Sequence, residues 1–405
     1  MKIKFIHKDV SERGKIMNIE TLKASYENVF GGSEKAKVFF SPGRVNLIGE
    51  HIDYNGGCVF PSAITYGTYA VVTEREDRKV RLYSGNFEDR GLIEFDLSDL
   101  SHTEDENWSA YVKGVIVQFL EAGYKVANGF DAYVFGTIPN GSGLSSSASL
   151  ELLVSQILKE LNGYDISMVE MVKLSQKAEN EYVGVNCGIM DQFAIGMGKQ
   201  NYAIKLNTND LSYEYAKANL GDTSILIMNT NKKRELADSK YNERRGECDK
   251  ALELLKTKVD INFLCDLTVE EFNRVSNVLN KDVLYRRAKH AVTENERVKL
   301  AIEALGDGDL ARFGKLLNKS HQSLRDDYEV TGQELDTIVE LAWAQDGVLG
   351  ARMTGAGFGG CAIALVKNEM LEAVKEAISK GYKEAIGYDA DLYVATIGDG
   401  TKTLA

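Results

Sequence analysis

IPNGSGLSSSASLELLVSQIL, from Ile138 to Leu158, is the stretch that says most about the fold of this 405-residue chain. An apolar strand is predicted to end at Pro139, and the glycines at 141 and 143 let the backbone come close to a ligand. The serines that follow open a helix whose first N–H groups have no partner inside the helix and point toward the same space. The pattern indicates an anion-binding loop, although an ordinary N-capped helix after a glycine turn explains the same residues equally well.

The loop differs from the two commonest nucleotide-binding patterns. No Gly-Lys-Ser/Thr ending closes it and GxGxxG is absent, so it is neither a Walker A loop nor a dinucleotide-binding fingerprint. A nucleotide phosphate bound here would depend on backbone N–H groups, the helix dipole and Mg²⁺ more than on a lysine of the loop.

A second segment, SPGRVNLIGEHIDYNGG, holds a high density of polar side chains between Ser41 and Gly57, namely Arg44, Asn46, Glu50, His51, Asp53 and Asn55. A sugar requires such a set because each buried hydroxyl needs both a donor and an acceptor. A solvated turn is the alternative, and a lone histidine is more often structural than catalytic. The acidic neighbours on both sides of His51 favour a binding site.

A third segment, KAENEYVGVNCGIMDQFA, places Glu179 and Asp191 on either side of a turn at Gly188. A Mg²⁺ ion takes one carboxylate together with phosphate oxygens, whereas a hydroxyl nucleophile needs a second carboxylate to accept or orient its proton. The two acids fit that division, although Glu179 alone is equally typical of a solvated surface. MTGAGFGG, residues 353–360, predicts either backbone packed against a phosphate or the first loop, or a tight hairpin.

The expected helices and strands fall into two regions, with a boundary near residue 215 that gives domains of residues 1–215 and 216–405. The first region mixes strands at 37–40, 69–74, 79–83, 130–138 and 202–206 with helices at 108–124, 144–161 and 167–183. The second holds long, charge-rich amphipathic helices from about residue 235 to 345, of which those at 284–305 and 311–327 are the clearest. It also holds a helix at 370–381 and strands at 224–229, within 348–366 on both sides of the glycine loop, and at 391–397.

Composition excludes several classes of partner. Forty-eight Lys and Arg against 60 Asp and Glu give a net charge of −12, which repels nucleic acid and anionic lipid. The five cysteines are widely spaced and form no CxxC pair, so neither a zinc site nor a disulfide framework is indicated. The basic N-terminus is interrupted by charges, and no stretch approaches the ~18 apolar residues of a membrane span. We therefore expect a cytoplasmic protein.

Together the segments resemble the galactokinases, a branch of the GHMP small-molecule kinases. GRVNLIGEHIDYNGG resembles the galactokinase signature, PNGSGLSSSASLE the phosphate-binding motif shared by GHMP kinases, and MTGAGFGGCAIALV their third motif. The order and spacing fit from about residue 25 to residue 398, and only the first segment is specific to the branch. The resemblance implies an α+β fold of two lobes, the first like domain 2 of ribosomal protein S5 and the second ferredoxin-like with added helices, with ATP and sugar between them.

The resemblance also implies an activity and its residues. The activity is transfer of the γ-phosphoryl group of MgATP to the C1 hydroxyl of α-D-galactose, with Asp191 as the catalytic carboxylate and Arg44 as its cationic partner. The family's sugar contacts fall on Arg44, Glu50, His51, Ile52, Asp53, Gly188, Asp191 and Tyr241. The family's nucleotide contacts fall on Ser84, Gly141, Ser142, Gly143, Leu144, Ser145, Ser146 and Ser147, and its Mg²⁺ ligands on Ser147 and Glu179. We expect a monomer whose partners are galactose and ATP alone.

Three alternatives stay open. A kinase for N-acetylgalactosamine or another sugar would share every motif and differ only near C2 of the sugar. A galactose sensor that binds ATP and sugar without turnover lacks the Ser-Ala pair of the phosphate loop, whereas Ser147 and Ala148 are present here. A mevalonate- or homoserine-type kinase would lack the dense Glu-His-x-Asp cluster, which ranks it last.

Overall fold

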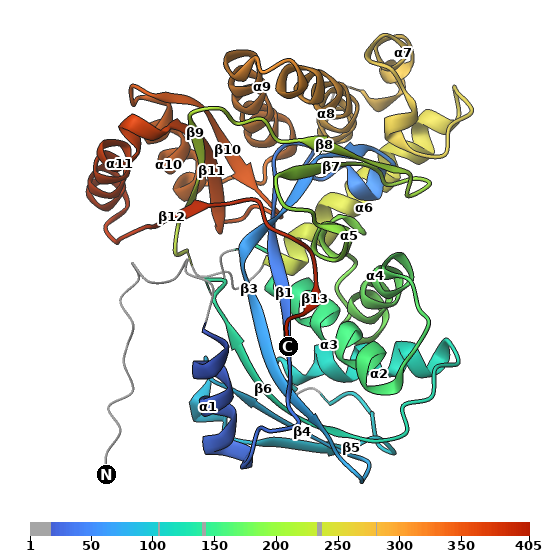
Figure 1. The fold of residues 1–405 in the computed structure, drawn as a ribbon. Helices are drawn as coiled ribbons and strands as arrows, with labels where there is room; N and C mark the ends of the chain where they lie inside the picture. Colours follow the sequence, from blue (N-terminus) through green and yellow to red (C-terminus); the bar gives the residue numbers. More distant parts are fainter. Residues whose placement is uncertain (1–17, 104–105, 140–142, 233–236, 281) are drawn as a thin grey trace.

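The structure is a computed structural model that describes residues 18–103, 106–139, 143–232, 237–280 and 282–405 (Figure 1). Gly141 and Ser142 of the predicted phosphate loop lie outside these residues. The helices are α1 (Ile19–Phe30), α2 (Ser109–Glu121), α3 (Ser146–Asn162), α4 (Met168–Lys177), α5 (Met190–Met197), α6 (Ala237–Lys256), α7 (Val269–Val275), α8 (Val283–Gly306), α9 (Leu310–Ser323), α10 (Gln333–Trp343) and α11 (Leu371–Ile386). The strands are β1 (Lys37–Asn46), β2 (Cys58–Val59), β3 (Pro61–Glu74), β4 (Lys79–Ser84), β5 (Ile93–Asp96), β6 (Phe130–Gly136), β7 (Tyr202–Asn207), β8 (Tyr213–Lys217), β9 (Thr223–Asn229), β10 (Val348–Thr354), β11 (Cys361–Lys367), β12 (Asp391–Ala395) and β13 (Lys402–Thr403).

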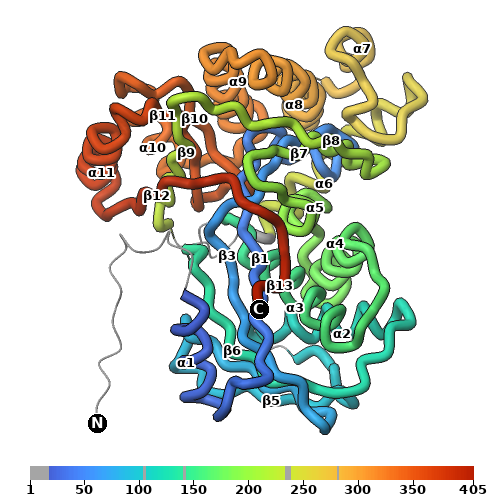
Figure 2. The backbone as a smooth tube through the Cα atoms, in the orientation of Figure 1, coloured from blue at the N-terminus to red at the C-terminus, as the bar shows by residue number. Residues whose placement is uncertain are grey.

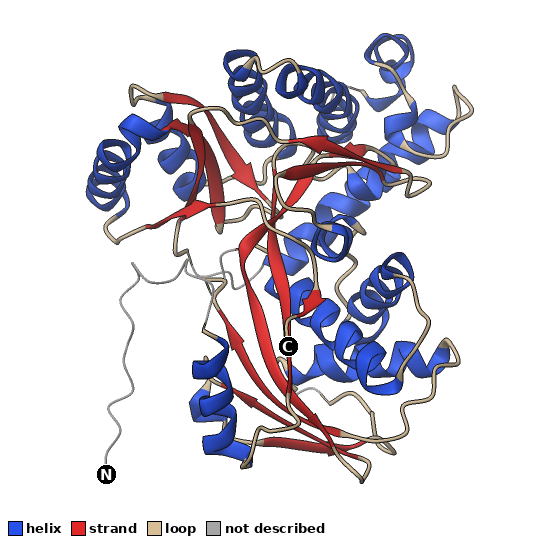
Figure 3. Cartoon of the chain, in the orientation of Figure 1, coloured by secondary structure: helices blue, strands red, loops and turns tan. Residues whose placement is uncertain are grey.

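A six-stranded sheet of order β13-β1-β3-β6-β4-β5 forms the base of the molecule (Figure 3). Successive side chains of a strand point to opposite faces, and β1 shows this directly. Val38 and Phe40 pack with Leu22 and Tyr26 of α1, whereas Phe39 joins the main core on the other face. The second face is covered by the group of helices that includes α2 and α3 (Figure 1). The sheet is therefore the middle of three layers.

Strands β1 and β3 are longer than the sequence pattern predicted, which had placed them at 37–40 and 69–74. Both are buried along nearly their whole length, so polar and apolar residues do not alternate and the pattern hides their extent. The extension matters for the site. A bulge between Pro42 and Arg44 changes the register of β1, and the strand continues to Asn46. The polar segment from Ser41 to Gly57, called the sugar-type segment below, therefore begins inside the sheet.

A second, four-stranded antiparallel sheet has the order β10-β11-β9-β12. Its strands follow a β-α-β-β-α-β path, with α6 to α10 between β9 and β10, and α11 between β11 and β12. That path is the ferredoxin-like motif, here with added helices, as the resemblance implied. Strands β10 and β11 carry the third motif between them, so its glycine loop lies at one edge of this sheet.

Two predicted helices end earlier than expected and one continues further. The helix predicted at 167–183 stops at Lys177 and passes into a wider π turn, Ala178–Val183, that ends at Gly184 with φ of +88°. The helix predicted at 311–327 likewise becomes a π turn at Leu324–Tyr328. Helix α11 continues to Ile386. Both π turns matter below, because they carry Glu179 and Tyr328.

The end of the chain returns to the first sheet. Strand β13 pairs antiparallel with β1, and Figure 2 shows this last segment of the chain running beside β1. A short three-stranded sheet, β2-β7-β8, lies beside the sugar-type segment. No helix among the described residues is long and apolar enough to cross a membrane.

Candidate active site

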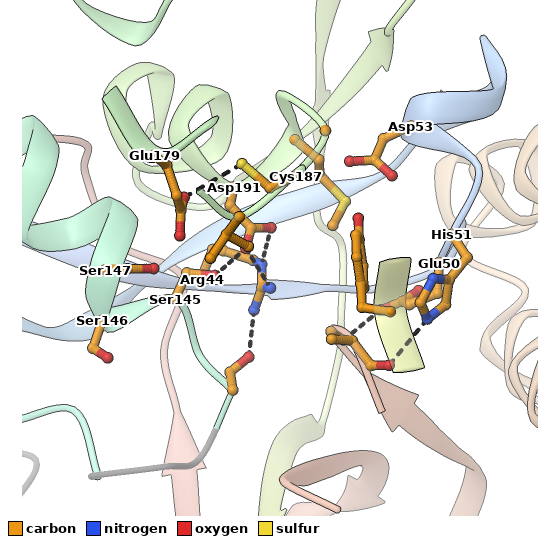
Figure 4. A pocket seen from close by; sticks show the side chains of 17 residues that line it. Arg44, Glu50, His51, Asp53, Ser145, Ser146, Ser147, Glu179, Cys187 and Asp191 are labelled. Carbon is orange, nitrogen blue, oxygen red and sulfur yellow. Dashed lines mark hydrogen bonds and ion pairs between the residues drawn. The ribbon is translucent and has the colours of Figure 1, made fainter. Parts of the chain in front are cut away.

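A cavity of about 240 Å³ lies where the three motif segments meet (Figure 4). Twelve predicted site residues line it, namely Arg44, Glu50, His51, Asp53, Gly143, Ser145, Ser146, Ser147, Glu179, Gly188, Asp191 and Tyr241. Val185, Cys187, Met190, Gly355 and Ala356 complete the lining. The lining residues come from β1, the turn after it, α3, the π turn, α5, α6 and the loop after β10, so the fold brings distant segments of the sequence to one cavity.

Three predicted contacts do not line this cavity. The side chains of Ile52 and Leu144 are buried, with 0% and 1% of the residue exposed, so each packs in the core. The carbonyl of Leu144 accepts a hydrogen bond from the backbone N–H of Arg44 at 3.2 Å. This bond connects β1 to the predicted phosphate loop, residues 141–147, which is called the phosphate-type loop below. Ser84 lies at the end of β4, where its hydroxyl accepts from the backbone N–H of Asn86 at 3.3 Å.

Arg44 and Asp191 form the central ion pair of the cavity. The Arg44 Nε and Nη2 atoms donate to the two carboxylate oxygens of Asp191 at 2.7 and 2.8 Å, a two-point contact that fixes the plane of the acid. The hydroxyl of Ser145 donates to the same carboxylate at 2.6 Å, and Arg44 Nη1 donates to the carbonyl of Gly143 at 2.8 Å. One acid is therefore held jointly by the sugar-type segment and the phosphate-type loop.

Glu50 is held by the protein on both carboxylate oxygens. One oxygen accepts from the backbone N–H of Gly355 at 3.0 Å, and the other accepts from Asn46 at 2.8 Å and from the guanidinium of Arg352. Burial raises the pKa of Glu50, and Arg352 opposes that shift. Sequence reasoning missed Arg352, which is fully buried in β10 and lies about 300 residues from Glu50 along the chain.

Asp53 and Gly188 face each other closely. A Cβ atom added to Gly188 would lie 1.8 Å from one carboxylate oxygen of Asp53, so only glycine leaves that acid its place. Burial and then the nearby Asp191 raise the pKa of Asp53 to about 6. Two acids of the cavity therefore repel each other until a ligand or a proton intervenes.

Glu179 lies on the opposite side of Asp191 from Asp53 (Figure 4). Burial, followed by the charge of Asp191, raises the pKa of Glu179 to about 7, while a hydrogen bond with Ser147 opposes the shift. The amide of Gln192 donates to Glu179 at 2.7 Å and to Glu151, a fully buried acid of α3, at 3.0 Å. A hydroxyl and a carboxylate thus stand together at the start of α3, which suits one edge of a Mg²⁺ site.

The two glycine loops touch, as one interpretation of the third motif predicted. A Cβ atom added to Gly355, whose φ is +83°, would lie 2.8 Å from the carbonyl oxygen of Gly143. Among the described residues, no group of three or more His, Cys, Asp and Glu side chains is arranged to hold a metal ion. A metal held by Ser147 and Glu179 would therefore share its remaining positions with oxygens of a substrate or water.

Three family models match the chain. The model described as the galactokinase galactose-binding signature matches residues 24–74. The model of the GHMP kinases N terminal domain matches residues 110–199, and the model described as GHMP kinases C terminal matches residues 301–384. The first match contains Arg44 to Asp53, and the second contains the phosphate-type loop, Glu179 and Asp191.

Curated relatives are similar over almost their whole length. A galactokinase of Clostridium perfringens is 55% identical over 388 residues, which cover 96% of this chain and 100% of the relative. A galactokinase of Lactiplantibacillus plantarum has the same identity and coverage. Among solved structures, Lactococcus lactis galactokinase complexed with galactose superposes with a TM-score of 0.93 at 52% identity, over 95% of this chain and 99% of that one.

A more distant neighbour shares the fold alone. Mevalonate kinase of Methanococcus jannaschii superposes with a TM-score of 0.64 at 19% identity, over 89% of this chain and 98% of that one. The roles of the individual cavity residues stay predictions.

Proposed function

The chain belongs to the galactokinases, a branch of the GHMP kinases, and from this we propose that it transfers the γ-phosphoryl group of ATP to the C1 hydroxyl of α-D-galactose. The products are galactose 1-phosphate and ADP. The observation that carries the proposal is the position of Asp191, which Arg44 of the galactose-binding signature and Ser145 of the phosphate-type loop hold from two sides. An acid at this junction is placed to act on a sugar hydroxyl that faces a phosphate.

Asp191 orients or deprotonates the C1 hydroxyl, and Arg44 fixes the plane of that acid and offsets charge on the transferring group. A loose transition state for phosphoryl transfer needs little base strength, so positioning supplies most of the effect. Glu50, His51, Asp53, Gly188 and Tyr241 surround the sugar, whose hydroxyls meet donors and acceptors from these residues. Ser145, Ser146 and Ser147 lie at the N-terminus of α3, whose backbone dipole favours the phosphates.

Mg²⁺ is part of the proposal, with Ser147 and Glu179 as its protein ligands. The two side chains line the same cavity, and both carry oxygen atoms of the kind that Mg²⁺ prefers as ligands. The ion bound there would neutralise charge on the β- and γ-phosphates. The residues present therefore fit the ion.

We expect Ser147→Ala and Glu179→Ala to raise the Mg²⁺ concentration needed for half-maximal activity, because each removes one oxygen ligand. Galactose affinity, measured by calorimetry without nucleotide, should stay within a few-fold of the parent protein. Ser155→Ala is the matched control, since this buried serine of α3 bonds Ser175 at 2.9 Å, away from the cavity. A variant that lost sugar affinity at unchanged Mg²⁺ dependence would move its residue from the metal site to the sugar site.

The test of the substrate is a coupled assay of ATP with galactose, N-acetylgalactosamine, arabinose and glucose. We expect galactose to be phosphorylated and N-acetylgalactosamine to be rejected by a wide margin, because a pocket closed around the C2 hydroxyl cannot admit an acetamide group without moving backbone. Comparable kcat/KM for the two sugars would contradict the choice of galactose and leave the kinase fold intact. Binding of galactose and ATP without turnover would favour the alternative of a non-catalytic galactose sensor.

Three further expectations complete the proposal. The protein acts as a monomer, which light scattering at micromolar concentration tests, and it works in the cytoplasm. Its lobes divide near residue 215, a position that limited proteolysis tests. The absence of a CxxC pair in the sequence supports the cytoplasm. The four-stranded sheet, whose strands all follow residue 215, supports the division, although the position itself lies within β8 and the last strand, β13, returns to the first sheet.

A further inference from the structure

Both ring nitrogens of His51 are bonded to the protein. The Nε2 atom lies 3.1 Å from the carbonyl oxygen of Ala356, and the Nδ1 atom lies 2.7 Å from the hydroxyl of Tyr54. Burial, followed by the nearby His290, lowers the pKa of His51 to about 3, so its ring is neutral near pH 7. A neutral imidazole has one N–H donor and one bare acceptor.

These contacts decide which nitrogen carries the proton. A carbonyl oxygen can only accept, so Nε2 of His51 must donate to Ala356. The bare Nδ1 must then accept, and the hydroxyl of Tyr54 must donate to it. Burial raises the pKa of the Tyr54 phenol well above its ordinary value, so its proton stays in place.

The same reasoning continues away from the cavity. The Tyr54 oxygen lies 2.9 Å from the hydroxyl of Tyr328, and Tyr328 lies 3.0 Å from the thiol of Cys248. Because the Tyr54 proton is already engaged with His51, Tyr328 donates to Tyr54 and Cys248 donates to Tyr328. Tyr328 and Cys248 are 0% and 1% exposed. The result is a chain of hydrogen bonds that runs in one direction, from Cys248 on α6 to the carbonyl of Ala356.

Arg287 of α8 anchors the far end of this chain. Its guanidinium donates to Glu247 at 2.7 Å, to the carbonyl of Asp327 at 2.7 Å and to Glu329 at 2.6 Å. Glu247 precedes Cys248, while Asp327 and Glu329 flank Tyr328. One buried arginine therefore fixes the backbone on both sides of the Cys248 to Tyr328 contact.

The near end is constrained as well. His51 has a φ of +61°, a left-handed conformation that a residue with a side chain adopts only where its surroundings impose it. The side chain of Asn55 donates to the carbonyl of His51 at 2.8 Å, and the ring of Tyr328 lies 4.9 Å from the His51 ring. The protein thus fixes both the backbone and the ring of this cavity residue.

We propose that Tyr54 and Tyr328 are positioning residues for sugar binding, which hold the His51 ring by the hydrogen bond to its bare Nδ1 and so keep the Gly355–Ala356 loop against the turn that follows β1. The assignment of the ligand rests on the proposed function, but the hydrogen bond to Nδ1 does not. Without the Tyr54 hydroxyl, the buried Nδ1 acceptor is unsatisfied, and the ring can turn toward another donor. Its Nε2–H would then leave the carbonyl of Ala356, and the loop whose Gly355 N–H supports Glu50 would shift.

The experiment compares Tyr54→Phe, Tyr328→Phe and Cys248→Ala with the parent protein. The control is Tyr382→Phe, because the buried Tyr382 donates to the carbonyl of Thr230 at 2.8 Å, outside the chain of bonds. Three quantities are measured: the ¹⁵N chemical shifts of the His51 ring in ligand-free protein, the Kd of galactose and the Kd of ADP. The sequence has five histidines, so the ring signals can be assigned with a His51→Asn sample.

The expected effects decrease with distance from His51. Tyr54→Phe should move the ¹⁵N signal of His51 Nδ1 toward that of an acceptor without a hydrogen bond and weaken galactose binding about tenfold, the cost of one unsatisfied buried group. Tyr328→Phe should have a smaller effect of the same kind, and Cys248→Ala the smallest. ADP affinity should stay within twofold throughout, and Tyr382→Phe should change none of the three quantities.

Unchanged ¹⁵N signals in both Tyr54→Phe and Tyr328→Phe would overturn the proposal, as would equal losses of galactose and ADP affinity. Should Tyr54→Phe fail to fold, Tyr328→Phe tests the same hydrogen bond to Nδ1, because it leaves Tyr54 in place and removes only the hydroxyl that donates to the Tyr54 oxygen. If the Nδ1 signal moves as expected but another sugar from the panel is the ligand, the positioning role stands and the choice of galactose falls.

Discussion

Asp191→Asn is expected to lower kcat by ~10²-fold or more, the usual contribution of a positioned proton acceptor. The amide matches the carboxylate in shape but replaces an anionic acceptor oxygen with a donor. That donor would face Arg44 or the hydroxyl of Ser145, both of which now donate to Asp191. The substitution therefore removes the acceptor for the sugar hydroxyl and disturbs the plane in which Arg44 held it.

The Kd of ADP should stay within a few-fold in Asp191→Asn, because the change lies at the sugar side of the cavity. Asp131→Asn is the matched control for the loss of an arginine-paired acid. Asp131 on β6 accepts from Arg75 at 2.9 Å and from Arg81 at 2.7 Å and does not line the cavity. The Asp131→Asn variant should have a lower Tm than the parent protein and a kcat within about twofold of the parent value. Lost nucleotide binding with near-normal turnover at saturating ATP would reverse the roles assigned to Asp191.

The local features of the fold were predictable where one residue type imposes the geometry. Gly143, the serines and the apolar run after them are sufficient to predict the strand, loop and helix around residue 144. Helix α6 falls in the region from about residue 235 to 345 that was predicted to be helical, but its bounds were not predicted, because its 20 residues are dominated by charge and show little amphipathic pattern. It is placed by packing on α8 instead, which no local rule could reveal.

For the site, too, local patterns were predictable and long-range contacts were not. Each acid of the cavity lies in a segment whose polar composition indicates a binding site, yet nothing local indicates that Arg44 contacts Asp191, 147 residues later. That pairing came only from the resemblance to the GHMP kinases. Arg352, which directly precedes the third motif, and Tyr328, which stands in a charged stretch, escaped prediction because their partners Glu50 and Tyr54 lie more than 270 residues away along the chain. Long-range partners are set by topology, which a local pattern does not encode.

Gly188→Ala is expected to raise the KM for galactose tenfold or more, which is roughly the effect of losing one charge-assisted hydrogen bond to the sugar. The added Cβ would lie 1.8 Å from one oxygen and 2.4 Å from the carboxyl carbon of Asp53, so the acid must leave its present position. Gly188 is not among the described glycines with a left-handed φ, so the effect is steric and not conformational. The KM for ATP should change by less than twofold.

A double-mutant cycle shows whether the effect of Gly188→Ala passes through Asp53. If it does, Gly188→Ala combined with Asp53→Ala should bind galactose no more weakly than Asp53→Ala alone, because the displaced acid is already absent. Gly246→Ala on α6 is the control, since a Cβ added there meets no atom within 4 Å and alanine favours a helix. Additive losses in the cycle, with Tm unchanged, would mean that Gly188 contacts the sugar through its own backbone and that Asp53 has a separate task.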